Sequence, residues 1–297
     1  ALLAEVRAYE RSLGFRETRN FKQVHTEHGA YTMCGYAPRW QLPYSYEDPL
    51  IRWSEATTEP ACRDGAGDKD FYFAQTEAVG EVGTALTNGM IQGKLDRFLY
   101  LVIHEDCHDQ FDFPFGFEEA LCNVIGYKGM AEFAARKYGW WTGERRAVRH
   151  YVEKQAQLTY AVNRYYSDVE RLYERRALGE IDTTAAVRER ASLFAGAEHA
   201  LGWQAGTMNN VGLANEMTYS RHYPLAERIL EAMGGDLTKM VSFFKQVDRA
   251  KPSPGAALRE SGIADVKSAA AVRAIEQSVV KTAQYLLLRG ENGARTP

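Results

Sequence analysis

The sequence predicts an α+β fold that is mostly α, with a small N-terminal sheet and a helical C-terminal half. Two observations predict it. Between residues 14 and 70, proline, glycine and aromatic residues interrupt the chain often, as is typical of loops that join short strands. From residue 144 onward, apolar side chains recur with the helical period. No long flexible linker separates these parts, so we expect a mixed α/β lobe over residues 1–140 and a helical lobe over residues 141–297 in one compact unit.

The mixed lobe is expected to hold helices and a few strands. Its expected elements are a helix over residues 1–13, strands over residues 70–75 and 78–86, and helices over residues 95–110 and 117–138. Residues 71–73 are aromatic, which favours a strand, and the two glycines within 78–86 permit the close backbone approach of an edge strand. Pro114 and Gly116 interrupt the helical pattern and so separate the last two helices.

The helical lobe is expected to begin with a long helical hairpin. Residues 144–178 and 182–202 are charged and amphipathic, and Gly179-Glu180 separates them. Further helices are expected over residues 224–233, 236–247 and 263–288. Gly234-Gly235 followed by Asp236 is typical of a helix end and a new N-cap.

Composition excludes several classes of partner. The 297 residues carry 36 basic and 39 acidic side chains, so the formal net charge of -3 gives no footprint for nucleic acid. No apolar run approaches the roughly 20 residues that span a bilayer, and we expect no transmembrane segment in this chain. The first residues lack the charged-then-apolar order of a signal peptide. The oligomeric state stays open.

One segment, His104-Glu105-Asp106-Cys107-His108, has the pattern H-E-x-x-H. Histidines four apart on a helix lie on one face, so both imidazoles can reach a single metal ion. Glu105 follows the first histidine directly and therefore lies beside the ion, where it can accept a proton from a water molecule. We expect one zinc ion, bound by His104 and His108, with Glu105 as the general base.

Two adjacent acids compete for the place of the third ligand. Glu118 and Glu119 lie in the first turn of the helix that returns toward the motif, and they point about 100° apart, so only one can face the ion. We prefer Glu119, because it shares its face with the polar Asn123. Asp109 and Asp112 either bind the outer nitrogen of a histidine or face solvent.

A polar stretch from Asn209 to Pro224 is the best source of a donor for a tetrahedral oxyanion. Tyr219 and His222, three residues apart, could share a face and donate there, although a polar buried patch is an equal alternative. The histidines without a motif around them are interpreted as surface or core residues: His25, His28, His150 and His199.

The four cysteines contain no CxxC pair, so a thiolate metal site is not expected. An even count permits two disulfides, whereas buried small residues are the simpler reading. Cys107 and Cys122 lie beside the motif, and we hypothesise that they bridge its two helices.

Three stretches together resemble the bacterial family of predicted zinc aminopeptidases, which belongs with the gluzincin metallopeptidases. The stretches are Val6–Phe15, the His104–His108 motif with Phe117–Ala120, and Asn209–Tyr219 followed by Pro224 and Gly234–Leu237. They are spread along nearly the whole chain in the expected order. The family has an asparagine where Glu118 stands, and Cys107 and Cys122 replace alanine-like residues.

The resemblance implies a zincin-like metallopeptidase core with His104, His108 and Glu119 as zinc ligands and Glu105 as general base. It implies that residues 78–86 form an edge strand for an extended peptide substrate, and that the protein is periplasmic or exported, with the leader absent here. We therefore expect zinc-dependent, aminopeptidase-like hydrolysis of peptides. An aminopeptidase also needs an acid for the substrate amine, and the candidates are Glu77, Glu81, Glu118 and Glu216.

Two alternatives remain at this stage. One is a zinc-containing protein that binds a peptide or a partner without catalysis, and the other is a metal-dependent amide hydrolase that does not act on peptides. A carboxylate-bridged di-iron protein would need further Glu-x-x-His pairs, which the helical hairpin does not offer.

Overall fold

The computed structural model describes residues 1–25, 31–76 and 83–293. Helices predominate and the strands are few, so the predicted α+β, mostly α class is confirmed. Contacts between Cα atoms divide the chain into two compact units that alternate along the sequence. The first unit comprises Ala1–Gly29, Glu77–Glu153 and His222–Pro297, and the second comprises Ala30–Thr76 and Lys154–Arg221. The lobes expected from sequence, 1–140 and 141–297, are by contrast each continuous.

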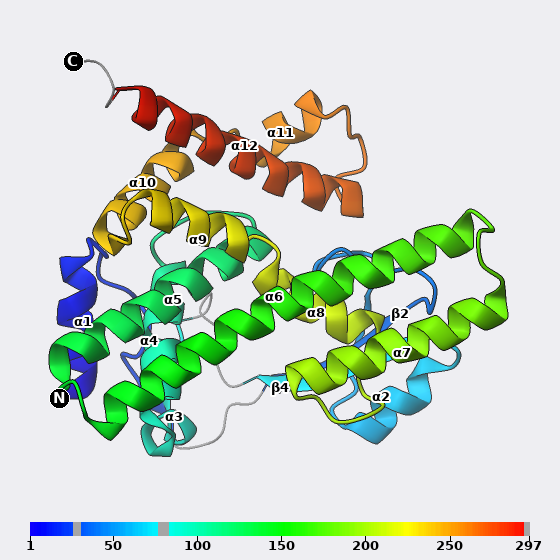
Figure 1. Ribbon diagram of the computed structural model, residues 1–297, viewed down its shortest axis with the longest axis horizontal. Coiled ribbons are helices and arrows are strands. Elements are labelled where there is room, and N and C mark those ends of the chain that lie inside the picture. Colours follow the sequence, from blue (N-terminus) through cyan, green and yellow to red (C-terminus); the bar gives the residue numbers. More distant parts are fainter. Residues whose placement is uncertain (26–30, 77–82, 294–297) are drawn as a thin grey trace. The chain divides into compact units, whose positions relative to one another are not determined.

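The first unit is largely helical (Figure 1). Its elements are α1 (Leu2–Ser12), β1 (Val24–His25), β5 (Leu86–Thr87), α3 (Asn88–Gln92), α4 (Leu95–His108), α5 (Phe115–Lys137), α9 (Tyr223–Ala232), α10 (Leu237–Ala250), α11 (Pro254–Glu260) and α12 (Ala269–Gly293). The short strands β1 and β5 pair in parallel. Of the predicted edge strand over residues 78–86, residues 78–82 lie outside the described residues, and only Leu86 is in a strand.

The pair α4 and α5 forms the centre of this unit, and α1 and α9 pack beside it. Leu99, Val102 and Ile103 of α4 are fully buried. A Cβ atom on Gly126 of α5 would lie 3.6 Å from the Cβ atom of His104, and one on Gly129 would lie 3.4 Å from Ile103. These are ordinary van der Waals distances, so α5 packs directly against the apolar side of α4, and this packing holds α4 in the core.

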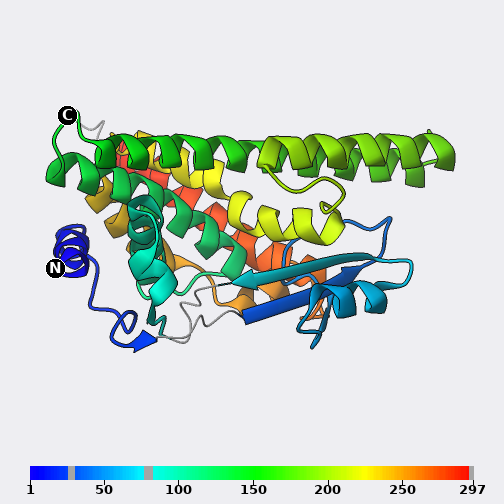
Figure 2. The same cartoon turned by 90° about the horizontal axis from the view of Figure 1, so that it is seen from below.

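The second unit contains a three-stranded antiparallel sheet in the order β3-β2-β4. The strands are β2 (Tyr31–Ala37), β3 (Arg52–Ser54) and β4 (Asp70–Thr76), so the predicted strand over residues 70–75 is confirmed. Figure 2 shows the sheet between α2 (Glu59–Ala66) on one side and α8 (Asn210–Ser220) on the other. A disulfide between Cys34 of β2 and Cys62 of α2 links the sheet to the first of these helices.

The predicted helical hairpin is present. Its helices are α6 (Gly143–Ala177) and α7 (Thr183–Leu201), which lie side by side in Figures 1 and 2. Gly179 turns the chain with a positive φ of 73°, a conformation that glycine adopts at no steric cost, and Asp182 caps α7. Residues of α6 up to Glu153 belong to the first unit, and the rest belong to the second.

Several short helices were not predicted from the sequence. α2, α3 and α11 each have a Thr or Ser N-cap whose hydroxyl accepts a backbone N–H, a local signal that the proline and glycine content around them hides. The helix predicted over residues 263–288 begins later, at Ala269, because a turn at Asp265 accepts hydrogen bonds from Lys267 and Ser268.

Candidate metal centre

Helix α4 presents His104 and His108 on one face, one turn apart. His104 is 4% exposed, and its Nε2 atom lies 3.2 Å from the Nε2 atom of His108. The two rings meet nearly at right angles, with an interplanar angle of 83°. This places two imidazole nitrogens at one point, as the spacing of the sequence predicts.

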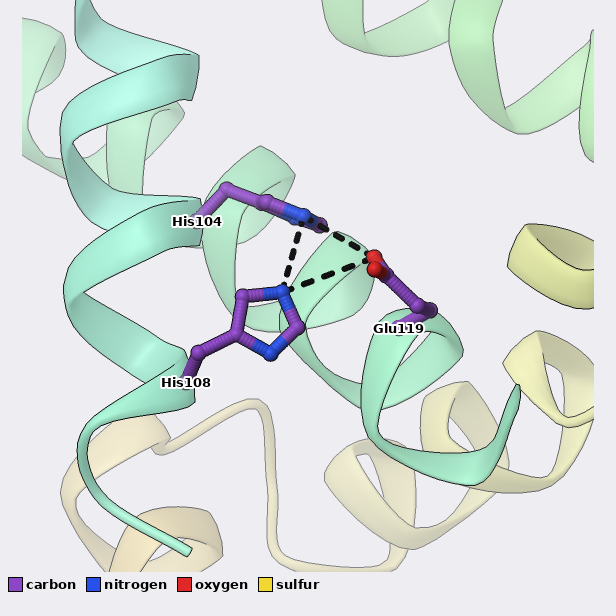
Figure 3. Close-up of side chains that lie close together, drawn as sticks. All are labelled: His104, His108 and Glu119. Carbon is purple, nitrogen blue, oxygen red and sulfur yellow. Dashed lines mark hydrogen bonds and ion pairs between the residues drawn. The ribbon is translucent and has the colours of Figure 1, made fainter. Parts of the chain in front are cut away.

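Helix α5 brings Glu119 to the same point from the opposite side (Figure 3). Its Oε2 atom lies 3.1 Å from Nε2 of His104 and 3.5 Å from Nε2 of His108. Donors held about 2.0–2.1 Å from a tetrahedral zinc ion lie roughly 3.3 Å from one another. The three separations therefore fit one metal ion, and the buried group of His104, His108 and Glu119 could hold it.

The electrostatics of this group favour a positive charge at its centre. Burial acts to raise the pKa of Glu119, but the charge of His108 and hydrogen bonds from both rings prevail and lower it to about 2. Burial acts to lower the pKa of His108, yet Glu119 and Glu118 raise it well above its usual value. A proton on His108 supplies one positive charge beside the carboxylate, and a divalent cation would supply two.

Glu105 is buried on α4 next to His104, and 6% of its surface is exposed. Desolvation raises the pKa of its carboxyl, while the charges of His104 and His108 act in the opposite direction and that of Glu119 adds to the increase. The carboxyl is thus within electrostatic reach of all three metal-ligand candidates. A raised pKa in a dry site suits a group that accepts and then returns a proton.

Glu118 does not join the three ligands but contacts one of them from outside. Its Oε1 atom lies 3.0 Å from Nδ1 of His108, and its Oε2 atom accepts the backbone N–H of Phe113 at 2.8 Å. The preference for Glu119 over Glu118 therefore agrees with the geometry. The contacts do not place Asp109 or Asp112 against a histidine ring. Asp109 binds Arg19, and Asp112 is fully exposed.

The end of α4 is held by side chains from elsewhere in the first unit. Asn20 donates its amide to the carbonyl oxygen of Glu105 at 2.7 Å, and Gln110 donates to that of Asp106 at 2.9 Å. The last carbonyls of a helix have no partner within it, so these bonds satisfy groups that would otherwise be orphaned. Thr18 and Asn20 also bind the carboxylate of Asp106, at 2.6 and 3.2 Å. No local pattern in the sequence marks Asn20, because the partners of its side chain lie more than 60 residues away.

The disulfide hypothesised next to the motif is present. Cys107 and Cys122 are both fully buried and join α4 to α5, with their Cα atoms 5.6 Å apart. Cys107 precedes the ligand candidate His108, and Cys122 follows Glu119 by three residues. The bond therefore links the two helices next to the metal-ligand candidates.

His222 and Tyr219 belong to different units of the structure. His222 is buried in the first unit, where its Nε2 atom lies 2.7 Å from Oε2 of Glu276 and its ring packs 5.2 Å from that of Phe117. Tyr219 lies on α8 in the second unit and is partly exposed. Their role as oxyanion donors stays a prediction.

The four acids considered as partners of a substrate amine lie in different parts of the chain. Glu77 and Glu81 lie outside the described residues, and Glu118 binds His108. Glu216 lies on α8, where burial raises its pKa to about 7.

No family model, curated protein or solved structure matches this chain. Within residues 1–25, 31–76 and 83–293, none of the helices is long and apolar enough to cross a bilayer.

Proposed function

We propose that this chain is a zinc metallopeptidase of the gluzincin type, with aminopeptidase-like activity and a zincin-like core formed by α4 and α5. The observation that carries the proposal is the convergence of His104, His108 and Glu119 at separations that suit one ion. A helix that supplies two ligands and a buried acid between them suits water activation, whereas a purely structural zinc site needs no such acid. The resemblance to predicted zinc aminopeptidases points to the same chemistry.

A zinc ion bound there would lower the pKa of a water molecule and polarise the scissile carbonyl group. Glu105 is the proposed general base: it takes a proton from the attacking water and then transfers that proton to the leaving amine. Its burial supports this role, because a carboxyl in a dry site holds the proton between the two steps. His222, which lies in the same unit as the metal-ligand candidates, is the proposed donor to the oxyanion.

The proposed substrate is a peptide, and the proposed location is an exported one such as the periplasm. Both disulfides, Cys34–Cys62 and Cys107–Cys122, support an oxidising compartment, since such bonds persist there and are rare in the cytosol.

The test is the variant Glu105→Gln, with zinc content and peptide hydrolysis measured on the same sample. We expect zinc to stay bound at the level of the wild-type protein, while kcat falls at least about 100-fold because the amide cannot accept the proton. The matched control, Glu174→Gln, changes an exposed acid of α6 and should leave both quantities unchanged.

Retained turnover in Glu105→Gln would remove Glu105 from its assigned role. Zinc in the wild-type protein without hydrolysis of any member of a peptide library would favour the binding-protein alternative. A folded wild-type protein that takes up no zinc would overturn the proposal altogether. The variant His104→Ala, which lacks one proposed ligand, is the comparison for zinc uptake.

A further inference from the structure

The carboxylate of Glu118 is held at both of its oxygens. Oε1 lies 3.0 Å from Nδ1 of His108, and Oε2 accepts the backbone N–H of Phe113 at 2.8 Å. The side chain is 12% exposed. Because each oxygen already has a partner and little solvent reaches the group, the carboxylate cannot rotate away from the imidazole without losing a buried hydrogen bond.

This contact decides which nitrogen of His108 carries a hydrogen. An ionised carboxylate only accepts hydrogen bonds, so Nδ1 of His108 must be the donor. The lone pair of the neutral ring is then left on Nε2, the nitrogen that faces Nε2 of His104 and Oε2 of Glu119. A metal ion takes the place of the second proton that His108 carries in the metal-free protein, and the contact with Glu118 then keeps the ring orientation and the remaining hydrogen on Nδ1.

We propose that Glu118 is a positioning residue for the metal centre, which holds His108 ready to bind the ion through Nε2. This inference rests on the proposed zinc site. Carboxylates that bind the outer nitrogen of a ligating histidine make the ring a stronger ligand, and their loss costs about 10–100-fold in metal affinity.

The two histidines differ in what holds their rings. Nδ1 of His104 is buried and has no hydrogen-bond partner among the described residues. His104 is instead held by packing, with its ring 5.1 Å from that of Tyr100 and its Cβ atom close to Gly126. Glu118 is thus the acceptor that orients one ring, and the core orients the other. Zinc affinity should depend strongly on Glu118.

The experiment compares zinc affinity, measured by competition with a chelator, in wild-type protein, Glu118→Ala and Glu118→Gln. We expect Glu118→Ala to bind zinc about 10–100-fold more weakly. Glu118→Gln keeps the size and can offer one amide oxygen to the ring, so its loss should be smaller. The matched control is Glu132→Ala, which removes an acid of the same helix that binds Tyr9 and Arg136 rather than a histidine.

A second readout separates positioning from a structural role. In the zinc-loaded wild-type protein and in Glu132→Ala, the hydrogen-bonded Nδ1–H of His108 should give a downfield proton resonance that is protected from exchange. Glu118→Ala should lose that resonance. If Glu118→Ala fails to fold, Glu118→Gln carries the test, because weaker zinc binding by a folded Gln variant supports the inference.

The outcomes distinguish this inference from the proposed function. A wild-type protein that binds no zinc overturns the proposed function and the role of Glu118 with it. A wild-type protein that binds zinc, together with folded Glu118 variants that bind it equally well and retain the resonance, overturns the role of Glu118 alone.

Discussion

Replacing Cys107 and Cys122 together by alanine removes the covalent link between α4 and α5 beside the metal-ligand candidates. The bond closes a loop with a sequence separation of 15 residues. Closing such a loop lowers the entropy of the unfolded chain, which stabilises the folded state by about 3 kcal/mol at 25 °C. We therefore expect the free energy of unfolding to fall by about 3 kcal/mol. For a chain of 297 residues, a loss of this size lowers Tm by about 5 °C.

The same change should weaken zinc binding. His108 and Glu119 lie one and three residues from the bridged cysteines, on the two helices that the bond joins. Without it, the separation of 3.5 Å between Nε2 of His108 and Oε2 of Glu119 depends on packing and on the hydrogen bonds between the two helices. Ordering these groups then costs part of the binding free energy.

The second disulfide provides a matched control. Cys34 and Cys62 close a loop with a sequence separation of 28 residues in the second unit, which predicts a stabilisation of roughly 3.6 kcal/mol. The double alanine variant of this pair should lose at least as much stability, yet keep the zinc affinity of the wild-type protein. The assays are denaturant unfolding and chelator competition on folded protein.

Equal zinc affinity in both double variants would refute the reasoning about ligand placement. A loss of stability below about 1 kcal/mol in the Cys107 and Cys122 variant would refute the loop-entropy argument for this bond.

Three further predictions concern stability in urea. Asn20→Ala should lower the free energy of unfolding by about 1–3 kcal/mol, because it leaves the buried carbonyl of Glu105 without the amide that binds it. Burial and Asp106 raise the pKa of Glu10 to about 9, so the folded state keeps a proton that the unfolded state releases above about pH 4.5. The free energy of unfolding of the wild-type protein should therefore fall as the pH rises from about 4.5 to about 9. The variant Glu10→Gln should lack this pH dependence. A flat difference between wild type and Glu10→Gln from pH 5 to 9 would contradict this. Asp182→Ala should cost about 1 kcal/mol by removing the N-cap of α7, and an unchanged midpoint would mean that the hairpin packing compensates.

Local signals in the sequence were enough for much of the helical structure. The helices predicted over residues 144–178 and 182–202 correspond to α6 and α7 within one or two residues, because long amphipathic repeats and a glycine turn depend little on the rest of the chain. The strand over residues 70–75 was predicted from its three consecutive aromatic residues, a local signal as well. Short helices such as α2 and α11 were not predicted, since about two turns leave too little periodicity to detect.

The candidate site also has one feature that the local sequence determines and one that depends on how the helices pack. The spacing of His104 and His108 on one helix determines by itself that their rings share a face. Whether Glu118 or Glu119 completes the group depends on the rotation of α5 about its own axis, which its packing against α4 and the disulfide between Cys107 and Cys122 hold in place.

By itself, the sequence determined the helix that carries two histidines and the acid between them, because these groups are related by the geometry of a single turn. Only the tertiary structure decided that Glu118 binds the outer nitrogen of His108 and that Asn20 binds the carbonyl of Glu105. The second of these contacts joins residues 85 positions apart. Local periodicity carries no information about how distant segments meet, so such contacts follow from the packing of the whole unit.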